Sequence, residues 1–268
     1  MIWNAKNGSV RIGNTEMSYV SFGSGNKNLI LLPGLSDGLS TVKGKALLLA
    51  YPYKMFFKEY TVYMFSRKND LPAQYSIQEM AKDQAIAMKK LGIHKASVLG
   101  VSQGGMIAQY LAIEHAELIE KLVIAVSAPS VNDTFQAIVS TWIEYANQGN
   151  YKQLMIDTAE NSYSQAYLNR YRKMYPVLGF IGKPKTYHRF LVNARAILHF
   201  DCTNALSTIT CPTLIIGGKR DKIVGPAASY ELHNQIKNSE LYMYEQFGHA
   251  AYEEAKDFNK RVFDFLTK

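Results

Sequence analysis

Short apolar runs bounded by turn residues recur along the chain. They are continuous rather than alternating, which is typical of strands buried on both faces of a parallel sheet. Six such runs are found, at residues 29–32, 61–65, 96–99, 122–126, 213–216 and 241–244. Before them, apolar and polar residues alternate around Gly13-Asn14, which predicts a β-hairpin at the start of the chain.

The segment between the second and third runs has the pattern of an amphipathic helix with defined ends. Ser76 and Glu79 have the spacing of a capping box, and Gly92 stands where a C-terminal cap belongs. A further helix is predicted from the end of the third run to about His115. Strands and helices therefore alternate, which favours an α/β fold of about eight mostly parallel strands flanked by helices.

This alternation stops between residues 129 and 206. The stretch has the pattern of several helices rich in Tyr, Phe, Met and Arg, without a buried-strand pattern. It is long for a connection in an α/β sheet, which indicates a function of its own. We expect a core formed by residues 1–128 and 207–268, with residues 129–206 inserted as a helical cap.

Length and composition indicate one large globular α/β domain. The chain has 268 residues, of which 47% are hydrophobic and 19% charged, values that exclude a disordered or fibrous protein. The formal net charge is +8, but the basic residues are scattered without a long run, so no nucleic-acid partner is expected. Residues 1–10 lack the apolar region of a secretory signal, and no apolar run is long enough to span a bilayer. A cytoplasmic protein without stable membrane association is the expectation.

The two cysteines, Cys202 and Cys211, have a spacing that matches no metal or redox motif. We interpret them as structural thiols in a reducing compartment. The sequence also contains no phosphate-binding loop, no dinucleotide glycine fingerprint and no cluster of metal ligands. Neither a cofactor nor a bound metal is therefore expected.

A Gly-x-Ser-x-Gly motif at residues 100–104 follows the run 96–99 and opens the next helix. A serine exposed at such a sharp strand-to-helix turn needs a strained backbone, and side chains two residues away would collide with it. Gly100 and Gly104 avoid that collision. The start of the helix also supplies backbone N–H groups and a positive dipole end for a developing oxyanion. Ser102 is the predicted nucleophile.

The sequence resembles the α/β-hydrolase superfamily along nearly its whole length. The matching blocks are Leu29–Leu35, Leu99–Gly105, Leu214–Asp221 and Phe247–His249. The resemblance implies a serine, an acid and a histidine in this chain order, with a lid inserted after the sixth strand. This chain supplies each part in that order.

Asp221 is the predicted acid, because it follows the run 213–216 at the carboxyl end of a strand, where the site of such a sheet lies. Asp201 is a weaker alternative, since no predicted strand precedes it. His249 is the predicted base, and it alone has the Gly-His setting after a late strand that the resemblance requires. The other five histidines are assigned to turns, helices or the insertion: His94, His115, His188, His199 and His233.

The resemblance places an oxyanion hole between the first buried strand and the nucleophile. The backbone N–H groups of Leu35 and Gln103 are the predicted donors. Many relatives carry His-Gly where this chain has Pro33-Gly34. Proline offers neither a backbone donor nor an imidazole, but the backbone hole itself is unaffected.

These residues predict acyl transfer to water through an acyl-enzyme intermediate on Ser102. The expected partner is a small-molecule carboxylic ester with an apolar acyl or aryl group, because the insertion would place aromatic side chains such as Trp142 or Tyr167 over the site. The same residues could serve carbon–carbon bond hydrolysis, thioester hydrolysis or perhydrolysis. A ligand sensor that retains the triad but turns over slowly is an alternative of a different class.

Overall fold

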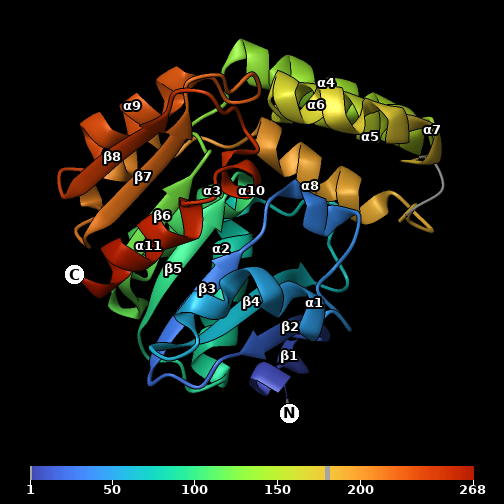
Figure 1. Ribbon diagram of the computed structural model, residues 1–268. Helices are drawn as coiled ribbons and strands as arrows, with labels where there is room; N and C mark the ends of the chain where they lie inside the picture. Colours follow the sequence, from blue (N-terminus) through green and yellow to red (C-terminus); the bar gives the residue numbers. More distant parts are fainter. Residues whose placement is uncertain (1, 179–181) are drawn as a thin grey trace.

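A single eight-stranded sheet forms the centre of the protein, described here in a computed structural model of residues 2–178 and 182–268 (Figure 1). Its order is β1-β2-β4-β3-β5-β6-β7-β8. The pairs β1–β2 and β2–β4 are antiparallel, and all other neighbours are parallel. The strands are β1 (Lys6–Ile12), β2 (Thr15–Phe22), β3 (Lys27–Leu32), β4 (Tyr60–Lys68), β5 (Ala96–Val101), β6 (Ile119–Ala125), β7 (Thr213–Gly218) and β8 (Ser239–Tyr244).

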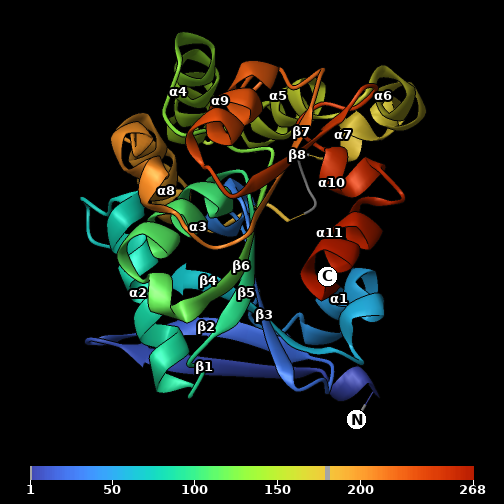
Figure 2. The same cartoon turned by 90° about the vertical axis from the view of Figure 1, so that its left-hand side faces the viewer.

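Helices cover both faces of this sheet. The faces have separate hydrophobic clusters, one containing residues of α2, α3 and α9 and the other residues of α1, α10 and α11. Figure 2 shows α2 and α3 on one side of the sheet and α1 and α11 on the other. The helices are α1 (Ala46–Ala50), α2 (Ile77–Lys90), α3 (Gln103–Glu114), α4 (Asp133–Asn147), α5 (Tyr151–Ser162), α6 (Gln165–Tyr171), α7 (Tyr175–Leu178), α8 (His188–Leu198), α9 (Pro226–Gln235), α10 (Ala251–Glu254) and α11 (Phe258–Thr267).

The predicted fold class is confirmed. All six apolar runs coincide with strands of the parallel part of the sheet, although β6 ends at Ala125, one residue before the predicted end, and β4 extends to Lys68, beyond it. The capping box of α2 is formed in both directions: the Glu79 N–H donates to Ser76 Oγ at 3.1 Å, and the Ser76 N–H donates to Glu79 Oε2 at 2.8 Å. The hairpin turn is also present, with Gly13 at φ +58 between β1 and β2.

Helices α4 to α8 occupy the chain between β6 and β7. In the described residues of this stretch the β-structure consists of an isolated bridge between Ser130 and Asp201. Figures 1 and 2 both show α4 to α7 grouped beyond one end of the sheet.

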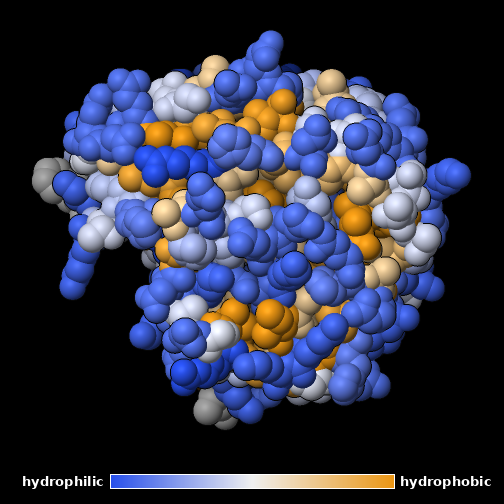
Figure 3. All heavy atoms as spheres, turned by 180° about the vertical axis from the view of Figure 1, so that it is seen from behind, coloured by the Kyte–Doolittle hydropathy of each residue, from blue (hydrophilic) through white to orange (hydrophobic). Residues whose placement is uncertain are grey.

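The surface combines polar and apolar areas. From behind, hydrophilic residues cover most of the molecule and apolar residues form several separate patches (Figure 3). Within the part of the chain that the structure describes, no helix has both the length and the apolar character that crossing a membrane requires.

Candidate active site

Ser102 lies in the turn between β5 and α3 with φ 53 and ψ −120, a backbone region that residues other than glycine rarely adopt. Neighbouring strands and loops hold it there. Its N–H donates to the Ala125 carbonyl at 2.9 Å, and its own carbonyl accepts from Ser127 Oγ at 2.9 Å. The turn therefore presents Ser102 at the carboxyl end of the parallel strands, where α/β sheets carry their sites.

The two glycines of the motif are required by close backbone contacts. A Cβ on Gly100 would lie 2.4 Å from the Gly104 carbonyl oxygen. A Cβ on Gly104 would lie 1.9 Å from the carbonyl oxygen of Leu32, in the neighbouring strand β3. Both distances are far inside van der Waals contact, so the Gly-x-Ser-x-Gly spacing follows from the packing of the turn against the sheet.

Ser102, His249 and Asp221 form a continuous hydrogen-bonded relay. His249 Nε2 lies 2.9 Å from Ser102 Oγ, and His249 Nδ1 lies 2.9 Å from Asp221 Oδ2. Asp221 and His249 are 5% and 7% exposed, so water competes little for these bonds. The second carboxylate oxygen, Asp221 Oδ1, accepts the N–H groups of Ile223 and Val224 at 2.9 and 3.1 Å.

Asp201, the alternative acid, is placed differently. It is exposed, and its Oδ1 accepts the Thr203 N–H at 2.9 Å in a local turn. Its backbone carbonyl accepts the Tyr110 hydroxyl at 3.0 Å. The carboxylate beside His249 is therefore that of Asp221.

The predicted oxyanion donors begin two short helical segments that flank Ser102. Leu35 is the first residue of the 3₁₀ helix η2 (Leu35–Gly38), and Gln103 is the first residue of α3. Within the described residues, neither backbone N–H has a hydrogen-bond partner. Gly34 lies directly against the nucleophile, since a Cβ there would be 3.3 Å from Ser102 Cβ. An oxyanion formed at Ser102 would therefore lie near two N–H groups that have no other acceptor.

A buried arginine joins the two sides of this candidate oxyanion hole. Arg67, at the end of β4 and 1% exposed, donates from Nη1 to the Pro33 carbonyl at 2.8 Å and from Nη2 to Gln103 Oε1 at 2.8 Å. Gln103 Nε2 in turn donates to the Asn193 carbonyl in α8 at 2.7 Å. One guanidinium thus holds the Pro33-Gly34 turn, the start of α3 and, through Gln103, a helix of the insertion.

Arg67 and Arg189 share one carboxylate, that of Asp37, a residue of η2 that is 2% exposed. Asp37 Oδ2 accepts the Arg67 backbone N–H at 3.0 Å and Arg189 Nη2 at 2.8 Å. Burial lowers the pKa of the Arg67 guanidinium, while the neighbouring Asp37 carboxylate opposes that shift. The result is a buried ionic group behind the candidate oxyanion hole that links η2, β4 and α8.

Sequence reasoning missed this group. The signal in the sequence was an arginine two residues after the apolar run 61–65, at the end of the strand where the site lies. A single arginine after a strand usually faces water, and Asp37 and Arg189 are far from it in the sequence. Only the folded chain brings the three side chains together.

An uncharged cavity of about 140 Å³ opens at Ser102. Apart from His249, none of the described residues that line it is Asp, Glu, Lys, Arg or His. Burial raises the pKa of Tyr252 well above its ordinary value, so this hydroxyl also stays neutral. The lining residues are Gly34, Leu35, Ser36, Leu39, Ser102, Phe135, Trp142, Met155, Thr158, Ser162, Phe190, Ile197, Ile223, His249 and Tyr252.

The expectation for the aromatic lining is partly wrong. Trp142 lines the cavity, but Tyr167 is absent from its described lining and instead stacks between Tyr163 and Tyr171, with ring centroids 4.1 and 4.3 Å away. The other tyrosines between residues 129 and 206 are likewise absent from the described cavity lining. The rings of Tyr163, Tyr167 and Tyr171 thus contact each other rather than the cavity.

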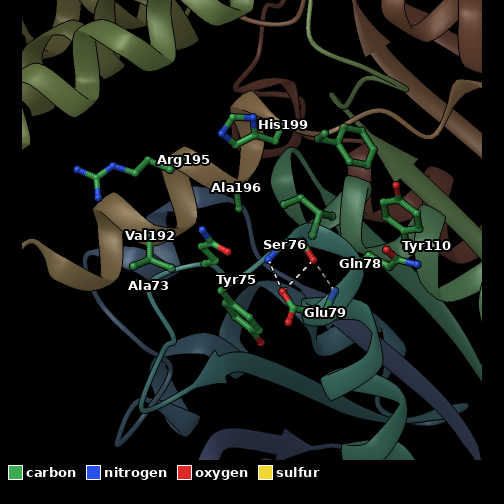
Figure 4. A pocket seen from close by; sticks show the side chains of 13 residues that line it. Ala73, Tyr75, Ser76, Gln78, Glu79, Tyr110, Val192, Arg195, Ala196 and His199 are labelled. Atoms are coloured by element: carbon green, nitrogen blue, oxygen red, sulfur yellow. Dashed lines mark hydrogen bonds between the residues drawn. The ribbon is translucent and has the colours of Figure 1, made fainter.

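A second cavity, of about 530 Å³, lies between α8 and the start of α2 (Figure 4). It contains neither Ser102, His249 nor Asp221. Ser76 and Glu79 bind each other in the capping box, and Arg195 extends away from the other side chains (Figure 4). Its polar groups do not converge on one point, so this larger cavity has no evident chemistry. In the described residues there is also no group of three or more His, Cys, Asp or Glu that could hold a metal ion.

A family model of the alpha/beta hydrolase fold matches residues 63–256, which is more than half of the chain. The chain belongs to the α/β-hydrolase fold family. The resemblance inferred from the motifs is thereby confirmed. Because known relatives in this family are hydrolases, the coarse assignment as a hydrolase is also supported.

Similarities to individual proteins agree with this family assignment. The chain is 27% identical to serine hydrolase BPHL of Homo sapiens, over 96% of this chain and 85% of that protein. It is also 27% identical to a 2-hydroxy-6-oxononadienedioate/2-hydroxy-6-oxononatrienedioate hydrolase of a Pseudomonas species, over 72% of this chain and 73% of that protein. The enol-lactonase of Burkholderia xenovorans LB400 has the same fold, with a TM-score of 0.84 at 22% identity over 97% of this chain and all of the other.

Proposed function

We propose that this protein hydrolyses carboxylic esters with a small, uncharged acyl group through an acyl-enzyme on Ser102. The observation that carries the proposal is the buried relay from Ser102 Oγ through His249 to Asp221, with both hydrogen bonds at 2.9 Å. A serine hydroxyl is a weak nucleophile until an adjacent base takes its proton, and His249 Nε2 is in reach to do so. The similarity to a relative named as a serine hydrolase supports the same nucleophile.

The reaction proceeds in two steps, acylation of Ser102 and hydrolysis of the acyl-enzyme. In the first, His249 Nε2 takes the Ser102 proton while Oγ attacks the ester carbonyl, and the oxyanion is held by the N–H groups of Leu35 and Gln103. The C–O bond to the leaving group breaks as His249 returns the proton to the alcohol. In the second step, water replaces the alcohol, His249 takes its proton, and the carboxylic acid leaves with Ser102 restored.

Asp221 acts by orienting the imidazole and stabilising its protonated form. Two backbone N–H groups fix Asp221 Oδ1, which leaves Oδ2 to accept the proton on His249 Nδ1. That tautomer leaves Nε2 free as the base. The buried setting of both side chains keeps this geometry in place between turnovers.

Residues 129–206 serve as the cap of this site. Its helices supply about half of the cavity lining: Phe135, Trp142, Met155, Thr158, Ser162, Phe190 and Ile197. Most of these side chains are apolar, and the cavity that they help to enclose measures about 140 Å³. An apolar, enclosed acyl site of this size suits short chains and excludes water from the acyl-enzyme.

The uncharged lining separates this proposal from carbon–carbon bond hydrolysis of dicarboxylates. The Pseudomonas relative is named for a dioate, whose carboxylates would need cationic or strongly donating partners. None of the described residues that line the cavity here is Lys or Arg. An ester with a neutral acyl group leaves no charge unpaired in this environment.

A panel of p-nitrophenyl esters with acyl chains of two to ten carbons tests the proposal. We expect turnover that falls as the acyl chain outgrows the cavity, and loss of at least 10⁴-fold in kcat for Ser102→Ala. Ser36→Ala is the matched control, because Ser36 lines the same cavity without contacting His249 in the relay, and it should keep its activity. Reaction with a fluorophosphonate but no ester turnover would instead favour a ligand sensor. Activity that survives in Ser102→Ala would contradict the proposal.

A further inference from the structure

The helical segment formed by α1 and the adjoining 3₁₀ helix η3 (Tyr51–Phe56) exposes large apolar side chains to solvent. Leu47, Leu48, Tyr51 and Met55 are 53%, 73%, 65% and 41% exposed. We call these four side chains the α1 face. A helix on the surface of a globular protein normally turns polar side chains outward, so an outer face of this composition indicates a contact.

The opposite side of this helical segment is buried in the hydrophobic core. Ala46, Ala50 and Phe56 are at most 2% exposed and belong to the hydrophobic cluster that also contains α11. Figure 2 shows α1 on the same side of the sheet as α11. Since the inner side chains already fill their place in the core, the α1 face cannot be buried by a rotation of the helix. Within the described residues, these four side chains stay exposed to solvent.

Lysines surround the α1 face. Residues 38–58 contain four lysines and neither Asp nor Glu. Lys43, Lys54 and Lys58 are exposed. The exposed Glu59 follows directly, but the strip remains net positive, whereas surface helices usually mix the two signs.

Aromatic rings complete the strip. Lys54 Nζ lies 3.9 Å from the centre of the Tyr51 ring and 4.4 Å from that of Trp3, in the 3₁₀ helix η1 (Ile2–Asn4). Trp3 and Tyr51 themselves meet edge to face, with ring centroids 6.2 Å apart. Tryptophan, tyrosine and lysine beside exposed leucines make up the composition that favours the boundary between lipid headgroups and acyl chains.

We propose that the α1 face docks reversibly on a bilayer that contains anionic lipids. The segment lies in the plane of the interface, with Leu47, Leu48 and Met55 among the acyl chains and the lysines at the lipid phosphates. A second copy of the chain fits less well. A two-fold contact through this face would set the lysines of one copy against those of the other. A surface that is both apolar and net cationic matches an anionic membrane better.

Vesicle flotation measures this directly. The intact protein is mixed with 100 nm vesicles of phosphatidylcholine alone, or of phosphatidylcholine with 30% phosphatidylglycerol, and bound protein is recovered with the floating vesicles. We expect binding to the anionic vesicles that exceeds binding to the neutral ones by at least tenfold. Raising the salt concentration should weaken it, because salt screens the lysines.

Two pairs of variants separate the α1 face from the rest of the surface. Leu47→Gln/Leu48→Gln removes apolar area, and Ile86→Gln/Tyr230→Gln does the same at exposed sites on α2 and α9, across the sheet. Lys43→Gln/Lys54→Gln/Lys58→Gln removes three positive charges beside the α1 face. Its control, Lys82→Gln/Lys90→Gln/Lys237→Gln, removes the charges of three exposed lysines elsewhere on the surface. Each α1 variant should lower vesicle binding at least tenfold, with the lysine variant near a hundredfold at low salt, and both controls should bind as the unaltered protein does.

The possible outcomes are distinct. Absence of binding to anionic vesicles by the unaltered protein overturns the proposal, as does equal binding to both kinds of vesicle or equal loss in the controls. If Leu47→Gln/Leu48→Gln instead abolishes a concentration-dependent dimer seen by light scattering, the face is a protein interface and the membrane assignment is wrong. Hydrolysis of a water-soluble ester by each variant confirms that the variants are folded, and its rate does not depend on the docking surface.

Discussion

The turn around Ser102 and the helices between β6 and β7 reach the same cavity by different physical means. In the turn, almost every residue is dictated by a close contact: Gly100 and Gly104 have no space for a Cβ, and Ser102 keeps an unusual backbone conformation through bonds to Ala125 and Ser127. In the helices, the lining comes from side chains that pack on each other with no comparable backbone requirement. The position of Ser102 is therefore set by close backbone contacts, whereas the shape of the cavity is set by side-chain packing.

Among substitutions that compare the two regions, Gly104→Ala should have the largest effect, because its Cβ would lie 1.9 Å from a backbone oxygen of β3. We expect a loss of ester hydrolysis of at least 10³-fold and a destabilisation of about 2 kcal/mol or more. Gly149→Ala is the matched control between α4 and α5. Its φ is +67 with nothing within 4 Å of the Cβ, so it should cost only about 1 kcal/mol and leave activity intact. Similar losses of activity in both would remove the contrast between the two regions.

Arg67→Met comes next, because it removes the guanidinium that joins Pro33 to Gln103. We expect kcat to fall by about 10- to 100-fold at a nearly constant KM, since the oxyanion donors are needed more in the transition state than in the bound substrate. Stability should fall by about 3 kcal/mol, because Asp37 and Gln103 lose a buried partner.

Two controls distinguish positioning by Arg67 from a purely structural role. Active-site titration with a fluorophosphonate counts the folded sites, so kcat refers to these alone. Arg67→Lys restores the charge but cannot reach both partners as a planar fork does, so it should recover stability more than kcat. A kcat per titrated site that equals that of the unaltered enzyme would show that Arg67 does not set the oxyanion geometry.

Much of this molecule could be predicted from sequence, where the determining contacts are local. Continuous apolar runs marked the parallel strands, and the spacing of Gly100, Ser102 and Gly104 marked the turn. The proximity of His249 and Asp221 to Ser102 followed from their places at the ends of late strands. The cluster of Arg67, Asp37 and Arg189 was missed, because its members meet only in the folded chain.

The aromatic lining was predicted less well for a related reason. Tyrosines at helical spacing can turn toward the cavity or toward each other, and composition does not distinguish the two arrangements. Tyr167 contacts the rings of Tyr163 and Tyr171, while Met155 of α5, which the sequence did not single out, lines the cavity. Which side chains face the substrate depends on the rotation of each helix, and that is set by tertiary packing.

A smaller effect is expected from Met155→Ala, which enlarges the cavity next to Ser102. The ratio of the rate on an eight-carbon ester to the rate on acetate should rise several-fold, with little change in the rate on acetate. Tyr167→Ala is the control from the same region, and it should leave this ratio unchanged, because Tyr167 is absent from the described lining. A change in the ratio for Tyr167→Ala would place α6, rather than α5, at the acyl end of the site.

The smallest effect concerns Glu160, which accepts two hydrogen bonds from Arg172 at 2.8 and 2.7 Å and one from the Tyr175 hydroxyl at 2.8 Å. These bonds, that to Arg172 first, lower the pKa of Glu160 to about 2. Because the folded pKa lies below the unfolded one, the carboxylate stabilises the fold above about pH 4.5, and this contribution is lost as the pH falls toward 2. Glu160 is a partly exposed group, so Glu160→Gln should lower Tm by only a few degrees at neutral pH. The difference in Tm should shrink below pH 4.5, and a difference that grows in acid would contradict this assignment.

If His249 activates Ser102 as the nucleophile, covalent modification will occur on Ser102 and depend on His249. The protein is treated with a fluorophosphonate, digested, and mapped by tandem mass spectrometry, beside the Ser102→Ala and His249→Ala variants. We expect a single phosphonyl group on Ser102, none in Ser102→Ala, and labelling slowed by at least 10³-fold in His249→Ala. A phosphonyl group on another residue, or labelling of Ser102 at an unchanged rate without His249, would contradict this mechanism.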